Sequence, residues 1–272
     1  VLIRVHAAGV NPVDTYISQG QFSGIPEDLP YIPGIDGSGI VEKVGAKVTK
    51  FSVGDRVFFT GDLQCGSYAE YTAKDEGRCW KLPQHLSFEQ GACIGIPYFT
   101  AYKALISKVD CLRDQTILVH GASGGTGLAT CQIAKVLALK VLGTAGSDEG
   151  ARVVKERGMA DQVFNHKQKN YAHKILVSSD FFNYTYTDNV GVDIIVEMAA
   201  DMNLERDASL IKPGGTIADE WNTAGQYILQ LLEGKKLNPV VDKVYPLEDA
   251  VKAHHDIMHN QGSKGKLVLK IV

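Results

Sequence analysis

The chain has 272 residues, of which 44% are hydrophobic, and a formal net charge of −3, so it can bury a sizeable core in one or two domains. Its Lys and Arg residues are spread along the sequence and no run of 18 apolar residues occurs, which gives no reason to expect nucleic-acid binding or a bilayer span. The five cysteines are odd in number and never spaced as Cys-x-x-Cys, which favours reduced thiols and a cytoplasmic location.

The N-terminal part of the chain predicts a small β-rich domain. Residues 1–5 alternate as in a half-buried strand, which is expected to end at Gly9. Asn11 precedes a proline and is therefore expected to be extended, with a short helical turn after it. In the range 30–83 short apolar runs alternate with glycine and proline, which is typical of a β-barrel. Residues 86–106 predict two short helices around a Gly/Pro interruption.

The segment 114–135, DQTILVHGASGGTGLATCQIAK, has the pattern of a buried strand, a glycine-rich turn and a helix. A pyrophosphate can bind the backbone at such a helix N-terminus, where free N–H groups and the helix dipole stabilise its charge and a Cβ would obstruct it. The glycine spacing is GxxGxxG instead of the usual GxGxxG, so a turn built only for tight strand–helix packing is the alternative. A second strand at 140–144 completes a βαβ unit and favours cofactor binding. The residues expected at the cofactor are Gly121, Ser123, Gly124, Gly125, Thr126 and Gly127.

The rest of the chain continues the pattern of an α/β fold with a doubly wound parallel sheet. A helix is predicted at 150–158, and buried strands of the parallel type at 160–164 and 192–198. Residues 209–217 are interpreted as a helix end, a turn and another strand. The polar and aromatic segment 178–189 is interpreted as a surface loop.

Several long motifs, in order along the chain, make the sequence similar to a known family. They include GVNPVDTYISQG, PGIDGSGIVEKVG, GIPYFTAYKAL, VHGASGGTGLATCQIAK and YPLEDAVKAHHDI. The sequence resembles the zinc-independent quinone oxidoreductases, the zeta-crystallin family, of the medium-chain dehydrogenase/reductase superfamily. The resemblance implies a discontinuous GroES-like β-barrel catalytic domain, residues 1–98 and 236–272, that encloses a Rossmann domain, residues 99–235. It also implies a homodimer or homotetramer, with NADPH and substrate held between the domains.

The sequence departs from this family pattern after Ala218. Family members have a few dozen further residues there, which complete the Rossmann sheet, whereas this chain continues directly into DEWNTAGQYILQLLEGKK. A truncated parallel sheet would expose an apolar edge and face to water. We therefore expect a stretch to be missing from this sequence, in preference to a shortened sheet.

The resemblance places Asn11 and Tyr16 beside the nicotinamide and Phe22 at the mouth of the substrate site. An amide can hold a carbonyl oxygen, and a phenol can donate a hydrogen bond as charge develops on oxygen. The residues alone equally allow Asn11 to brace the turn before a proline and Tyr16 to be an interface aromatic. Asp14 is expected to anchor this turn.

The sequence predicts no metal site. Zinc-dependent relatives place ligands at the positions of Asn11 and Ile35 and near Asp36 and Ile96, and an amide with two apolar side chains is a poor donor set for Zn²⁺. The adjacent histidines 254–255 would point about 100° apart on a helix, which makes a poor chelate.

The choice between NADPH and NADH depends on the end of the second Rossmann strand. NAD-preferring folds place an acidic residue about 20 positions after the glycines. Here Gly146 stands 19 positions after the last glycine of the turn and is followed by Ser147. The missing carboxylate leaves room for a 2′-phosphate, and analogy with the family adds His166 and Lys167 as cationic partners, so NADPH is predicted. The acidic pair 148–149 argues against this choice.

Two further cofactor contacts are implied by the family. Thr100, in IPYFTAYKAL, would line the cofactor site, and Lys264 and Lys266 would reach the cofactor phosphates. The alternatives are that the aromatic neighbours of Thr100 pack a domain interface and that the two lysines are only solvated.

The leading hypothesis is an NADPH-dependent enzyme that reduces quinones and related activated carbonyls without a metal. A second enzyme hypothesis is the reduction of enones or 2-enoyl thioesters by hydride addition to the β-carbon. The third, from a different class, is a crystallin-like structural role or RNA binding, although the composition has no basic stripe with interleaved aromatics.

Overall fold

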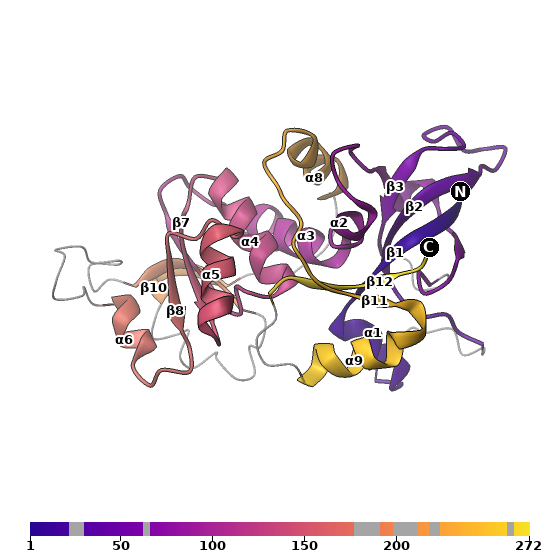
Figure 1. The fold of residues 1–272 in the computed structure, drawn as a ribbon. Coiled ribbons are helices and arrows are strands. Elements are labelled where there is room, and N and C mark those ends of the chain that lie inside the picture. The colour runs from indigo at the N-terminus through magenta and orange to yellow at the C-terminus, as the bar shows by residue number, and fades with distance from the viewer. Residues whose placement is uncertain (22–29, 62–65, 177–190, 198–210, 218–223, 260–263) are drawn as a thin grey trace. The chain divides into compact units, whose positions relative to one another are not determined.

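The computed structural model describes residues 1–21, 30–61, 66–176, 191–197, 211–217, 224–259 and 264–272 (Figure 1). Contacts divide the chain into two compact units, Val1–Phe99 with Thr223–Val272 and Thr100–Asn222. The second boundary was predicted at 235, whereas helix α8 (Ala224–Glu233) belongs to the first unit and packs on strand β5 (Cys79–Lys81). The predicted loop 178–189 and Phe22 lie outside the described residues. No helix of the described segments is both long and apolar enough to cross a membrane.

The first unit is built on a seven-stranded sheet. Its strand order is β11, β12, β1, β2, β3, β5, with β4 pairing to β1. All pairs are antiparallel except β11 with β12. Buried apolar side chains of β1, β2 and β3 form the core of this sheet. The strands are β1 (Leu2–Val10), β2 (Asp36–Lys43), β3 (Arg56–Phe59), β4 (Tyr71–Ala73), β5, β11 (Val241–Pro246) and β12 (Lys266–Lys270).

Strand β1 continues to Val10 and does not end at Gly9, so that expectation was wrong. A Cβ at Gly9 would lie 2.3 Å from the carbonyl oxygen of Ala92, the last residue of α2. Glycine at this position therefore lets a helix pack directly on the strand. The helices of the first unit are α1 (Pro12–Ser18), α2 (Phe88–Ala92), most of α3 (Gly95–Tyr102), α8 and α9 (Ala250–His259), with short 3-10 turns at Glu76–Arg78 and Leu247–Asp249.

The second unit contains a five-stranded parallel sheet in the order β10, β9, β6, β7, β8. The chain runs outward from β6 through β7 to β8, and β9 then pairs with the other side of β6, so the strand order reverses at β6. Ligands bind at such a reversal point in open α/β sheets. The strands are β6 (Thr116–Val119), β7 (Lys140–Ala145), β8 (Gln162–Asn165), β9 (Val192–Val196) and β10 (Ile211–Ile217), and the helices are α4 (Gly125–Val136), α5 (Asp148–Glu156) and α6 (Tyr171–Leu176), with a π-helical turn at Lys103–Ser107.

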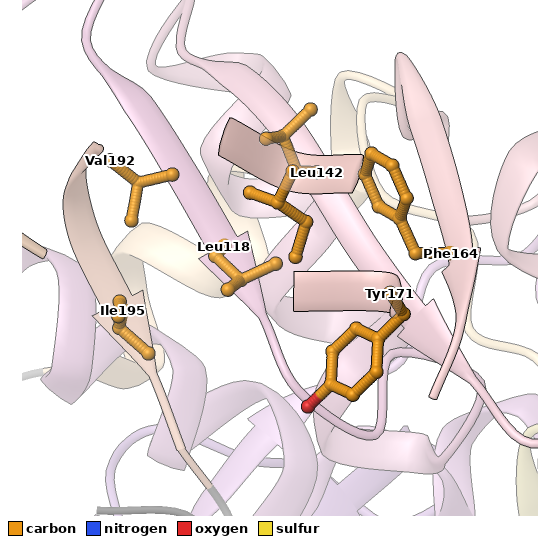
Figure 2. Packing of buried hydrophobic residues seen from close by; sticks show 7 residues of the cluster. Leu118, Leu142, Phe164, Tyr171, Val192 and Ile195 are labelled. Atoms are coloured by element: carbon orange, nitrogen blue, oxygen red, sulfur yellow. The ribbon is translucent and has the colours of Figure 1, made fainter. Parts of the chain in front are cut away.

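An apolar cluster holds this sheet together. Figure 2 shows Leu118 and Leu142 from the neighbouring strands β6 and β7 on the same side as Tyr171 of α6. Phe164, Val192, Ile195 and Ile175 complete the buried cluster. The predicted α/β class, with a GroES-like sheet unit and a doubly wound parallel sheet unit, is confirmed.

Two element boundaries in the second unit differ from the sequence prediction. Residues 211–217 form one strand, and the predicted turn appears only as an irregular register with β9 between Ile211 and Thr216. Helix α5 begins two residues earlier than predicted, at Asp148, because the Ser147 Oγ accepts a hydrogen bond from the backbone N–H of Gly150 and caps the helix.

Candidate functional site

The glycine-rich turn between β6 and α4 is open on the side where a cofactor phosphate would bind. Gly121 has φ +58, a backbone conformation that favours glycine, and a Cβ there would meet no atom within 4 Å. Gly124 is the extended N-cap of α4, and its N–H donates to the carbonyl oxygen of Gly121 at 3.0 Å. A Cβ at Gly127 would instead lie 2.4 Å from that same oxygen. The turn therefore combines a free approach for a ligand with tight packing of the helix.

The turn is fixed to the neighbouring strand by Thr144, which is fully buried in β7. The Gly121 N–H donates to Thr144 Oγ1 at 3.2 Å, and the Ala122 N–H donates to the Thr144 carbonyl oxygen at 2.9 Å. These bonds hold the N–H groups at the start of α4 in place without a ligand. Ser123 lies in the same turn and is buried, while Gly125 and Thr126 in the first turn of α4 are half-buried.

A second group of predicted residues meets at the end of β7. A Cβ at Gly146 would lie 2.9 Å from His166 Nε2 and 3.4 Å from Lys167 Cε, so both side chains lie against this glycine. Ser147 follows, with its hydroxyl at the N-terminus of α5. No carboxylate stands at the tip of the strand itself, and the first turn of α5 carries the acidic pair 148–149.

The two groups are joined by Ser123. A Cβ at Gly150 would lie 3.3 Å from the Ser123 Oγ and 3.1 Å from the Ser147 Oγ, so the glycine turn and the start of α5 are in contact. The carboxyl ends of β6, β7 and β8 thus present one continuous polar edge. Backbone N–H groups, two hydroxyls, an imidazole and an ammonium lie along this edge, and groups of this kind can bind the phosphates of a dinucleotide.

Sequence reasoning missed a buried pair beside this edge. His120 Nε2 lies 3.8 Å from Glu197 Oε2, with 4% and 3% of these side chains exposed. His120 Nδ1 also lies 3.5 Å from Thr144 Oγ1. The signal was available, because a histidine and a glutamate each follow directly after an apolar strand of the parallel sheet.

The first unit holds a buried polar cluster around Asp36, which is fully buried at the start of β2. Its Oδ1 accepts hydrogen bonds from Thr60 Oγ1 at 2.6 Å and from the Ile96 N–H at 2.9 Å. Its Oδ2 accepts from Asn11 Nδ2 and from Lys266 Nζ, both at 3.1 Å. The Lys266 ammonium also donates to Asn11 Oδ1. The side chain of Lys266 is therefore buried and hydrogen-bonded within the first unit, so the alternative that it is only solvated was wrong.

A chain of hydrogen bonds adjoins this cluster. Asp14 Oδ2 accepts from the Asn11 N–H at 2.8 Å, so Asp14 anchors the turn as expected, and from the Tyr68 hydroxyl at 3.2 Å. The Tyr68 hydroxyl in turn lies 3.2 Å from His254 Nε2. Burial, with the nearby Asp36 charge, raises the pKa of Asp14 to about 7. Burial also raises the pKa of Tyr68 and lowers the pKa of His254.

Three further predicted residues, Tyr16, Thr100 and Lys264, belong to other elements of the two units. Tyr16, on α1, is 40% exposed. Thr100 lies in α3 and is half-buried. The backbone N–H of Lys264 donates to Asp242 Oδ2 at 3.0 Å, just before β12. Of these, Tyr16 and Lys264 belong to the first unit and Thr100 to the second.

The residues around Asp36 do not fit a zinc ion. Ile35 and Ile96 offer no side-chain ligand, and the Lys266 ammonium lies where a divalent cation would have to approach the carboxylate. Burial raises the pKa of the nearby Cys93 thiol, which opposes a metal-binding thiolate. Within the described segments, no group of three or more His, Cys, Asp and Glu side chains could hold a metal.

Three family models match the sequence. One, described as an alcohol dehydrogenase GroES-like domain, matches residues 1–84, and two described as zinc-binding dehydrogenase match residues 125–218 and 220–269. The quinone oxidoreductase of Homo sapiens is 44% identical over 301 aligned positions, which cover 99% of this chain and 88% of that protein.

Two solved structures extend the comparison. An NAD-dependent alcohol dehydrogenase superposes with a TM-score of 0.90 at 27% identity, covering 100% of this chain and 92% of that one. A mycobacterial protein complexed with NADPH superposes with a TM-score of 0.81 at 26% identity, covering 100% and 91%.

The alignment with the human protein is longer than this chain. It has 301 positions against 272 residues in this chain, so at least 29 positions of the human protein have no counterpart here. One family model ends at residue 218 and the next begins at residue 220. The expectation that family members have additional residues after Ala218 stays a prediction.

Proposed function

We propose a function from one premise: this chain belongs to the quinone oxidoreductase family of the medium-chain dehydrogenase/reductase superfamily. It is an oxidoreductase that uses a nicotinamide cofactor to reduce quinones. The finer proposal is that the cofactor is NADPH and that related activated carbonyls are also reduced, without a metal.

The proposal of NADPH rests on the corner at the end of β7, which is formed by Gly146, Ser147, His166 and Lys167. His166 and Lys167 lie against Gly146, and Ser147 stands beside them. A lysine ammonium and a hydroxyl match the 2′-phosphate of NADPH, whereas NADH has no phosphate at that position to contact them. The acidic pair 148–149 lies in the first turn of α5, after the end of strand β7 at Ala145.

In this proposal the backbone N–H groups at the start of α4, from Gly125 onward, hold the pyrophosphate, with Ser123 as a side-chain donor. Thr100 and Lys264 are retained as further cofactor contacts. Bound NADPH would supply the hydride or electron equivalents. The chain itself binds and orients, because the hard chemistry belongs to the cofactor.

The residues proposed for the substrate lie in the first unit, on and before α1. Tyr16 is accessible and its phenol can donate to an oxygen on which charge develops. The Asn11 amide nitrogen has two hydrogens, and the contact with Asp36 uses one of them. Since only 1% of Asn11 is exposed, an acceptor reaches the second hydrogen only when neighbouring atoms move. Phe22 is proposed to line the mouth of the site.

The proposal is tested by initial rates of NADPH oxidation with a panel of planar quinones and, in parallel, a 2-enoyl thioester. Faster turnover of the quinones supports it. Turnover of the thioester alone would favour the enoyl reductase hypothesis, and a salt-sensitive shift of AU-rich RNA without any turnover would favour the binding hypothesis. Dialysis against a chelator is expected to leave the quinone rate unchanged.

We also propose that the protein is cytoplasmic and assembles as a homodimer or homotetramer, in line with the family resemblance. Sedimentation of the purified chain at micromolar concentration tests the assembly, and a single monomeric species would contradict it.

A further inference from the structure

We propose that Lys266 is a positioning residue for quinone reduction, because its buried ammonium fixes the Asn11 amide in a single orientation. The kinetic part of this inference rests on the proposed function. It assigns a role to a side chain that contacts Asn11 from the far end of the sequence, 255 positions away.

The orientation follows from the chemistry of the two neighbours. The oxygen and nitrogen ends of an amide have nearly the same shape, so its direction is decided by its hydrogen-bond partners. An ammonium can only donate and a carboxylate can only accept. The Asn11 Oδ1 must therefore face the Lys266 ammonium, and the Asn11 Nδ2 must face the Asp36 carboxylate. In a flipped amide the NH₂ group would face the Lys266 ammonium, donor against donor. The amide oxygen would face the Asp36 carboxylate, acceptor against acceptor.

Burial makes this constraint strong. The exposed fractions of Asn11, Asp36 and Lys266 are 1%, 0% and 5%, so water cannot replace a lost hydrogen bond. The Lys266 ammonium and the Asp36 carboxylate form a close ion pair in which each charge is also hydrogen-bonded to the amide. Such a network is most stable when every member is satisfied.

The sheet is built to bring these side chains together. Strand β1 lies between β12 and β2, and the register pairs Val10 with Leu267 and Gly9 with Asp36. A Cβ at Gly9 would lie 3.1 Å from both the Asp36 Cβ and the Lys266 Cε. The absence of a side chain at Gly9 therefore leaves the channel through which the lysine stem reaches the carboxylate.

A second glycine completes the site from the other side. A Cβ at Gly95, the first residue of α3, would lie 2.0 Å from Asp36 Oδ1. Without it, the next N–H, that of Ile96, donates to both carboxylate oxygens, at 2.9 and 3.0 Å. Asp36 is thus held from two directions and presents a fixed oxygen to Asn11.

The consequence for the reaction concerns the second hydrogen on Asn11 Nδ2. Because the amide cannot flip, the N–H bond to this hydrogen points in a single fixed direction. The ammonium on the carbonyl side also withdraws electron density from the amide, which makes its N–H a stronger donor to a substrate oxygen. Lys266 acts only through Asn11 and is not proposed to contact the substrate.

The first test compares Lys266→Met with Lys270→Met, which removes an exposed lysine from the same strand. We expect Lys266→Met to lower kcat for quinones at least tenfold while the Kd for NADPH stays within twofold of the wild-type value. Lys270→Met should match the wild type in both. A Lys266→Met enzyme with unchanged kcat would overturn the inference.

A double-mutant cycle separates positioning from a general loss of structure. If Lys266 acts through Asn11, the Lys266→Met change should have less than a twofold effect on kcat in an Asn11→Ala background. If the two losses multiply instead, Lys266 does not act through Asn11 and the inference is wrong.

Removal of the lysine alone leaves a buried carboxylate without its cation and can prevent folding. The charge-balanced pair Lys266→Met with Asp36→Asn is therefore measured as well. Positioning predicts that thermal stability returns toward the wild-type value in this pair while kcat stays low. Recovery of both would show that the ion pair serves stability only.

A measurement without turnover keeps the inference separate from the proposed function. With ¹⁵N-labelled asparagine, the Asn11 side-chain NH₂ is expected to give one sharp pair of NMR signals in the wild type. In Lys266→Met, or in the charge-balanced pair, these signals should shift or broaden. Unchanged signals would contradict the inference, whereas a wild-type protein that shows them but reduces no quinone would contradict only the proposed function.

Discussion

The Tyr68 hydroxyl donates a hydrogen bond of 3.2 Å to Asp14 Oδ2, and the same hydroxyl lies 3.2 Å from His254 Nε2. Asp14 is completely buried, while His254 is only partly buried, so Tyr68 connects a buried acid to a side chain near the surface. Within the described segments, Asp14 Oδ1 is buried without a hydrogen-bond partner. A carboxyl group in this position is better accommodated when it carries a proton.

This arrangement makes stability depend on pH. The pKa of Asp14 is raised from 3.8 to about 7, first by burial and then by the charge of Asp36, against the opposing effects of the Asn11 N–H and Lys266. The folded state therefore holds the proton more tightly than the unfolded state. The free energy of unfolding should fall as pH rises from about 4 to about 7, by roughly 4 kcal/mol at most from this group.

Asp14→Asn should remove that loss, because an amide needs no proton to stay neutral. We expect the variant to be more stable than the wild type at pH 8 and to have a flatter profile of Tm between pH 4.5 and pH 8. Asp55→Asn serves as the control, because the Asp55 carboxylate accepts a hydrogen bond from the Ser52 N–H and pairs with Lys81 near the surface. Parallel profiles for Asp14→Asn and the wild type would show that Asp14 holds no proton at neutral pH.

Two glycines of the same turn should respond differently to alanine. At Gly127 the added Cβ would lie 2.4 Å from the Gly121 carbonyl oxygen, so the backbone must shift, and we expect a loss of roughly 1–3 kcal/mol in thermal unfolding. At Gly124 the nearest contact is an ordinary 3.4 Å, so the stability of Gly124→Ala should change by less than about 1 kcal/mol.

The Gly124→Ala variant should nevertheless bind NADPH several-fold more weakly, because its methyl group lies at the N-terminus of α4 where the pyrophosphate is proposed to bind. Equilibrium titration of the folded variant measures this. Equal affinity in Gly124→Ala and the wild type would place the pyrophosphate elsewhere.

The corner at the end of β7 should control cofactor selectivity. Lys167→Gln is expected to raise the Kd for NADPH by about 10- to 100-fold and to leave the Kd for NADH unchanged. This factor corresponds to the free energy of one hydrogen bond to a charged group. Lys155→Gln removes an exposed lysine from the neighbouring helix α5 and should change neither. If Lys167→Gln weakens both nucleotides equally, the 2′-phosphate does not bind at this corner.

Tyr16 should contribute to turnover through its hydroxyl. Tyr16→Phe keeps the ring and is expected to lower kcat for quinones by up to about 10²-fold, with the Kd for NADPH unchanged. Tyr71→Phe, at a similarly exposed tyrosine on β4, is the matched control. Unchanged turnover in Tyr16→Phe would remove Tyr16 from the mechanism.

The parallel sheet and the glycine turn were predictable because their signals are local. The glycines from 121 to 127 stand between a β-branched apolar run and a helical repeat, so their place in the fold follows from a short window. The approach of His166 to Gly146 was suggested by the family, and the geometry of a parallel sheet makes it reasonable, since both residues follow the carboxyl ends of neighbouring strands.

The polar cluster of the first unit could not be predicted in the same way. Lys266 and Asp36 are 230 positions apart, and Tyr68 and His254 are 186 apart, so strand pairing and helix packing alone bring them together. For Lys266 the sequence left two alternatives open, a contact with the cofactor phosphates and a solvated side chain. Its position at the start of the apolar strand KLVLK was the local sign that it could be buried, and a buried lysine requires an acidic partner.

The central claim, an NADPH-binding oxidoreductase, is tested most directly by parallel titrations of the protein with NADPH and NADH, followed by nicotinamide fluorescence. We predict saturable binding of both nucleotides, with the Kd for NADPH at least about tenfold lower than that for NADH. Equal affinities would contradict the proposed 2′-phosphate corner. Absence of binding by either nucleotide would contradict the account of the second unit as a cofactor-binding domain.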